Sequence, residues 1–123
     1  MTGFAAEGTH WLIDCHGVDA AKLADPALLE TLLTGAATAA GARVLFHHFH
    51  RFGDRAGVTG VVLLAESHIT IHTWPEHGFA AIDLFLCGAT DPARATACIE
   101  AGLAPTRIVT IRQVRGVEAV NAL

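Results

Sequence analysis

Apolar and polar residues alternate along several short stretches of this chain, while two longer stretches carry apolar residues at helical spacing. The alternation predicts strands at residues 10–15, 43–52, 58–65, 68–74, 79–87 and 107–114. A first helix is expected from Asp19 or Pro26 to Ala40, and a second from Asp91 to about Gly102. The first helix has its apolar residues three and four positions apart, at Leu28, Leu29, Leu32, Leu33 and Ala36.

Turn-forming residues separate these elements and fix their order. Gly41 suits the end of the first helix, residues 53–57 suit a hairpin connection, and residues 75–78 join the next two strands. The resulting order, β-α-β-β-β-β-α-β, predicts an α+β fold of one domain spanning residues 1–123. We expect a two-layer α/β sandwich with a mostly antiparallel sheet and both helices on one face.

The two faces of the predicted sheet differ in chemistry, because side chains alternate along a strand. The helix-facing set is apolar, with Ile69, Ile71, Ile82, Leu84 and Leu86. The opposite set is mixed, with His68, Thr70, His72, Trp74, Phe79, Asp83, Phe85 and Cys87. That second face is too apolar in part to lie in water, so we expect it to pack on a second sheet.

Composition supports an oligomer and argues against two classes of partner. Hydrophobic residues make up 52% of the chain and charged residues 16%, so apolar surface is expected to be hidden between protomers. The net charge is −4, with the basic residues scattered, which argues against nucleic-acid binding. Apolar runs are too short for a membrane helix, and residues 1–7 lack a secretory signal, so we expect no membrane association and a cytoplasmic location.

Three cysteines without a paired spacing predict free thiols.

Reactive side chains gather in residues 65–88, which hold a serine, three histidines, two glutamates, an aspartate and a cysteine. Ser67 follows Glu66 where two strands join, and a tight bend there would aim the hydroxyl at the Glu66 carbonyl. Attack would give an ester; β-elimination and hydrolysis would then leave a pyruvoyl group on residue 67. A serine at such a junction is ordinarily only a turn residue.

Other candidates in this region also have ordinary explanations. His72 and Cys87 suit a proton-transfer pair, although a strand histidine or cysteine is often structural. Cys15 and Cys98 are expected to be structural. The histidines at 47, 48 and 50, and the pair His68 and His72, suggest a metal. The β-branched residues around that pair predict a strand, which separates the two imidazoles, so we expect no metal.

The segment 65–88 closely resembles the self-cleavage and active-site region of prokaryotic S-adenosylmethionine decarboxylases. Similar motifs lie at residues 8–14 (Gly-Thr-His-Trp-Leu-Ile-Asp), 49–52 (Phe-His-Arg-Phe) and 57–60 (Gly-Val-Thr-Gly). The resemblance implies cleavage between Glu66 and Ser67 into a β chain, 1–66, and an α chain, 67–123. It makes Ser67 the pyruvoyl precursor, His72 the group assisting cleavage, and Cys87 the donor that protonates the decarboxylated carbon.

The same resemblance implies a substrate and an assembly. Phe52 matches an aromatic residue that stacks on adenine, and Glu76 a carboxylate that binds ribose hydroxyls. Thr59 stands where the family commonly has serine, and so must supply the hydroxyl used in processing. The family implies a homodimer with its sheets face to face in an αββα arrangement, and a pyruvoyl group that decarboxylates S-adenosylmethionine for spermidine synthesis.

Two alternatives remain open from the sequence. Some relatives decarboxylate arginine or ornithine, and Asp54 or Asp83 offers a carboxylate for such a cationic side chain. The chain also fits a non-catalytic or metal-binding α/β dimer that keeps the scaffold.

Overall fold

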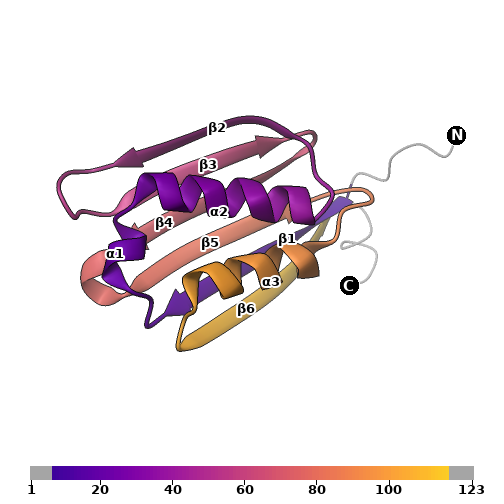
Figure 1. The fold of residues 1–123 in the computed structure, drawn as a ribbon. Coiled ribbons are helices and arrows are strands. Elements are labelled where there is room, and N and C mark those ends of the chain that lie inside the picture. Colours follow the sequence, from indigo (N-terminus) through magenta and orange to yellow (C-terminus); the bar gives the residue numbers. More distant parts are fainter. Residues whose placement is uncertain (1–6, 117–123) are drawn as a thin grey trace, which may run out of the picture.

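One antiparallel sheet organises the protein, whose computed structural model describes residues 7–116. The six strands lie in the order β2-β3-β4-β5-β1-β6, and each neighbouring pair is antiparallel. They span β1 Glu7–His16, β2 Val44–Arg51, β3 Val58–Leu64, β4 Ser67–Trp74, β5 Phe79–Leu86 and β6 Arg107–Gly116. The helices lie on one side of this sheet (Figure 1), which confirms the predicted α+β sandwich.

Aspartate caps and prolines set where the helices begin. The helices are α1 (Ala20–Leu23), α2 (Pro26–Ala39) and α3 (Pro92–Leu103), with a 3-10 turn, η1, at Pro75–His77. The side chain of Asp25 accepts a hydrogen bond from the backbone N–H of Leu28 and caps α2, while Asp91 caps α3 in the same way. A helix tolerates proline only in its first turn, because proline has no backbone N–H to donate. The single helix expected from residue 19 or 26 is therefore two helices.

The helix-facing side of the sheet forms the core, as strand parity predicts. Ile69 and Ile71 of β4 and Leu84 of β5 are fully buried. They pack in one cluster with fully buried side chains from all three helices, namely Leu23, Leu29, Leu33, Ile99 and Leu103. Burying each large aliphatic side chain contributes roughly 1.5–3 kcal/mol, so this layer supplies most of the driving force for folding.

The other side of the sheet, which we call the open face, carries large exposed apolar side chains. On its outer strands, Phe46 is 57% exposed and Ile111 is also 57% exposed. Further exposed members are Leu12, Phe52, Leu63, Trp74 and Val109. Several large apolar side chains exposed on one face are typical of an interaction site. The predicted packing against a second sheet therefore has a surface suited to it.

Candidate active site

The turn between β3 and β4 holds Glu66 in an unusual backbone conformation. Leu64 pairs with Ser67, so only Ala65 and Glu66 connect the two strands. Glu66 has φ of +66°, in the left-handed region where a side chain costs about 1–2 kcal/mol. Glu66, whose carbonyl belongs to the predicted cleavage bond, is therefore strained in the intact chain.

Ser67 and Cys87 lie side by side at the same end of the sheet. The Ser67 side chain is buried, with the residue 8% exposed, and its Oγ accepts a hydrogen bond of 3.1 Å from the backbone N–H of Cys87. This bond fixes the serine hydroxyl next to the backbone of Cys87. Glu66, Ser67 and Cys87, all predicted from the sequence, form one group.

Gly8 of β1 lies beside this group, although it was not among the site residues predicted from the sequence. A Cβ atom on Gly8 would lie 2.5 Å from Cε1 of Phe85 and 3.0 Å from Sγ of Cys87. Both distances are too short for ordinary packing. The glycine therefore leaves the space in which Phe85 and the Cys87 thiol lie.

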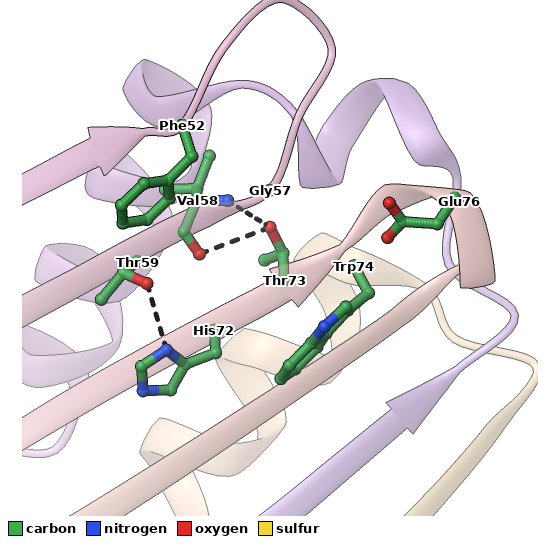
Figure 2. A pocket seen from close by; sticks show the side chains of 8 residues that line it. All are labelled: Phe52, Gly57, Val58, Thr59, His72, Thr73, Trp74 and Glu76. Carbon is green, nitrogen blue, oxygen red and sulfur yellow. Dashed lines mark hydrogen bonds between the residues drawn. The ribbon is translucent and has the colours of Figure 1, made fainter.

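A second group of predicted residues lies around a shallow hollow. His72 Nδ1 is 3.1 Å from Oγ1 of Thr59, its partner across β3 and β4 (Figure 2). The hollow holds about 250 Å³ and is lined by Phe52, Gly57, Val58, Thr59, His72, Thr73, Trp74 and Glu76. Figure 2 shows the rings of Phe52 and Trp74 on opposite sides of it. Trp74 is an aromatic lining residue that was not among the site residues predicted from the sequence.

The two groups do not meet within one chain. Ser67 and His72 are five residues apart on β4, which corresponds to about 16 Å along a strand. Their side chains also point to opposite faces, because five is an odd number of steps. The structure therefore joins Thr59 to His72 and Ser67 to Cys87, but keeps His72 away from Ser67.

Asp83 lies at the centre of a polar network on the open face. Its Oδ2 is 2.6 Å from Nε2 of His10 and 3.4 Å from Nε2 of His68, and the hydroxyl of Thr70 donates to its Oδ1. Burial raises the pKa of Asp83, but the hydrogen bonds from Thr70, His10 and His68 outweigh burial, so the pKa lies below 3.8. Asp83 is ionised at neutral pH.

The three cysteines are free thiols, as predicted. Cys15 is fully buried, and burial, followed by the charges of Glu100 and Asp14, raises its pKa to about 11. A thiol of this kind is not a nucleophile near neutral pH. Cys98 packs against the core.

Neither group of histidines that suggested a metal in the sequence converges on one point. His47 lies 3.0 Å from Glu30 of α2, whereas His48 and His50 stack with each other, 6.5 Å apart. His68 and His72 are about 13 Å apart along β4, too far to share an ion.

The carboxylates considered for a basic amino acid are also poorly placed. Asp54 is fully exposed, with its Oδ1 3.9 Å from Arg51. Asp83 is engaged by three side-chain donors. Neither carboxylate is a buried partner ready for a cationic side chain.

Comparisons with known proteins agree on one family. The family model for S-adenosylmethionine decarboxylase matches residues 9–116. An "S-adenosylmethionine decarboxylase proenzyme" of Sulfurihydrogenibium is 46% identical over 115 residues, 93% of this chain and 86% of that protein. A proenzyme of the same name from Prochlorococcus marinus is 53% identical over 81 residues, 66% of this chain and 64% of that protein.

A solved structure shares the fold. The crystal structure of the adenosylmethionine decarboxylase from Aquifex aeolicus superposes with a TM-score of 0.82 at 42% identity, covering 93% of this chain and 94% of that one. Among residues 7–116, no helix has the length and apolar character needed to cross a membrane.

Proposed function

The chain belongs to the S-adenosylmethionine decarboxylase family, and from that premise we propose that it removes the α-carboxylate of S-adenosylmethionine for polyamine synthesis. We propose further that the reaction uses a pyruvoyl group made from Ser67. The observation that carries the proposal is the left-handed Glu66 immediately before a buried, hydrogen-bonded serine. Strain at that residue is released when its peptide bond breaks.

Maturation would proceed through the Ser67 side chain. Oγ attacks the carbonyl carbon of Glu66, the C–N bond breaks, and an ester replaces the amide. A base then takes the α-proton of Ser67 as the Cβ–Oγ bond breaks, and the Glu66 carboxylate leaves. This elimination separates chains 1–66 and 67–123. Water then replaces the nitrogen at residue 67 and ammonia departs, which leaves the pyruvoyl group.

The residues around Ser67 fit the group that this chemistry makes. The pyruvoyl group supplies a carbonyl that binds the substrate amine and accepts the electron pair released with carbon dioxide. Cys87, whose backbone N–H donates to the Ser67 oxygen, carries the thiol that we assign as proton donor to the decarboxylated carbon. Phe85 and Gly8 fix the position of that thiol.

A second protomer would complete each site. His72 and Thr59 lie about 16 Å from Ser67 within one chain, yet the processing step needs a base beside Ser67. In a two-fold dimer, contacts are reciprocal. If Ser67 of one protomer meets His72 of its partner, the partner's Ser67 meets the first protomer's His72. The exposed apolar side chains of the open face, on which His72 lies, offer a surface for a facing sheet.

The hollow beside His72 suits an adenosyl group. Phe52 and Trp74 present aromatic faces, which stack on a flat base and attract a cation such as a sulfonium. Glu76 adds a carboxylate that accepts hydrogen bonds from ribose hydroxyls. The facing sheet of a partner would close the open side and exclude water.

A substrate comparison tests this proposal. Release of carbon dioxide from S-adenosylmethionine, arginine and ornithine is measured side by side with wild type, Ser67→Ala and Cys87→Ala. We expect turnover of S-adenosylmethionine only, no cleavage in Ser67→Ala, and cleavage with impaired turnover in Cys87→Ala. Exclusive turnover of an amino acid would contradict the substrate, and normal cleavage of Ser67→Ala would contradict the processing site.

A further inference from the structure

We propose that His10, His68 and Asp83 bind one divalent transition-metal ion, with Zn²⁺ the best match, on the open face of the sheet. None of these three residues is assigned to maturation or decarboxylation, and the proposal does not rest on that assignment. It also departs from the expectation of no metal, which considered only histidines close in sequence.

The three ligand atoms already converge. One imidazole nitrogen of His10, one of His68 and a carboxylate oxygen of Asp83 all lie within 4.8 Å of one another. Ligand atoms 2.0–2.2 Å from a tetrahedral Zn²⁺ are about 3.3 Å apart. The separation of 3.4 Å between His68 and Asp83 matches this value, and the 2.6 Å separation between His10 and Asp83 must widen by less than 1 Å.

Three adjacent strands hold the ligands in place. His68 of β4 and His10 of β1 both pair with Phe85 of β5, and Asp83 is the next residue on the same face of β5. The Phe85 ring stacks on His68 with centroids 5.9 Å apart and meets His10 edge-on at 5.4 Å. Both imidazoles are thus packed before any ion arrives, which lowers the entropic cost of binding.

The burial and hydrogen bonds of these side chains are typical of metal ligands rather than of exposed surface residues. The side chains of His10 and Asp83 are only 19% and 21% exposed. The Thr70 hydroxyl donates to the second oxygen of Asp83, as outer partners of ligating carboxylates do. Two imidazoles and one carboxylate favour Zn²⁺ over Mg²⁺ or Ca²⁺, which prefer oxygen ligands. A fourth position stays open for water.

Without an ion, the same atoms form a hydrogen-bonded network, with Asp83 accepting from both imidazoles. The two descriptions differ in one measurable respect. An ion must displace the proton from each imidazole nitrogen that donates to Asp83. It does so only where all three ligands can coordinate it together. A network alone gives the protein no affinity for a metal beyond that of exposed histidines.

Cobalt provides the test, because four-coordinate Co²⁺ absorbs visible light and Zn²⁺ displaces it. Wild-type protein stripped with EDTA is titrated with Co²⁺ until the spectrum is constant, and then with Zn²⁺. We expect one ion per chain and complete bleaching by Zn²⁺. His10→Gln and Asp83→Asn should bind at least tenfold more weakly, and Thr70→Val about 10–100-fold more weakly.

His48→Gln is the matched control, since it removes an exposed imidazole from the same face outside the site. It should leave the Co²⁺ spectrum and stoichiometry unchanged. Wild-type protein without a visible Co²⁺ spectrum would overturn the proposal, and so would Asp83→Asn or His10→Gln binding with wild-type affinity. Because the wild-type titration is decisive alone, the test holds even if one variant fails to fold.

Discussion

At the scale of single residues, the absence of a side chain at Gly8 leaves room for the Cys87 thiol. The Phe85 ring lies 2.5 Å, and the Cys87 sulfur 3.0 Å, from the position that a Cβ on residue 8 would take. We predict that Gly8→Ala still cleaves but loses about 10–100-fold in turnover, because displacing a reacting group by about 1 Å can cost that much. Gly35→Ala is the control, as nothing lies within 4 Å of the added Cβ. The rate of carbon dioxide release decides, and full activity of Gly8→Ala would refute the positioning role.

Asp83 gives a prediction for pH. Its pKa in the folded protein lies below the value of 3.8 that it has when unfolded. The folded state therefore gains stability above pH 3.8 and loses it as the pH falls through the lower, folded pKa. Thermal unfolding in EDTA should show wild type more stable than Asp83→Asn at pH 6, with the difference shrinking below about pH 4. A difference that stays constant to pH 2.5 would be inconsistent with this account.

At the scale of elements, the β3–β4 hairpin combines a fold requirement with a chemical one. Glu66 adopts a conformation that glycine accepts freely. In the uncleavable Ser67→Ala background, we predict that Glu66→Gly raises the free energy of unfolding by up to about 1 kcal/mol. With Ser67 intact, the same change should slow cleavage, because less strain is released.

Urea unfolding at one protein concentration measures the first effect, and the rate of chain separation measures the second. Ala65→Gly is the matched control, since Ala65 shares the turn without a positive φ, and it should destabilise the protein. If Glu66→Gly destabilises it equally, the turn is not strained.

The elements themselves were largely predictable from the sequence, whereas the contacts between residues of different elements were not. Alternation along β4 and β5 assigned Ile69, Leu84 and their neighbours to the core, and burial confirms this. The same alternation puts Ser67 and His72 on opposite faces, so their closeness in sequence gave no guide to contact. His10 joins Asp83 only because β1 lies beside β5, and strand order depends on packing of the whole sheet.

At the scale of the whole molecule, the split between the two groups predicts complementation. Ser67→Ala keeps His72, and His72→Ala keeps Ser67. If each site takes one residue from each protomer, their heterodimer contains one complete site, and the His72→Ala chain is cleaved there. We predict that co-expression of the two differently tagged variants yields cleaved His72→Ala chain, whereas neither variant alone is cleaved. Absence of cleavage in purified heterodimer would exclude a site shared in this way.

The central claim is that Ser67 becomes a carbonyl at a new chain end, and mass spectrometry after hydride reduction tests it most directly. Active protein is denatured with and without prior borohydride treatment, and the fragment beginning at residue 67 is weighed. The account predicts separate chains 1–66 and 67–123, with a hydride-reducible carbonyl on the second that is missing from Ser67→Ala. Active protein that retains an unbroken chain, or an unmodified serine at residue 67, would contradict it.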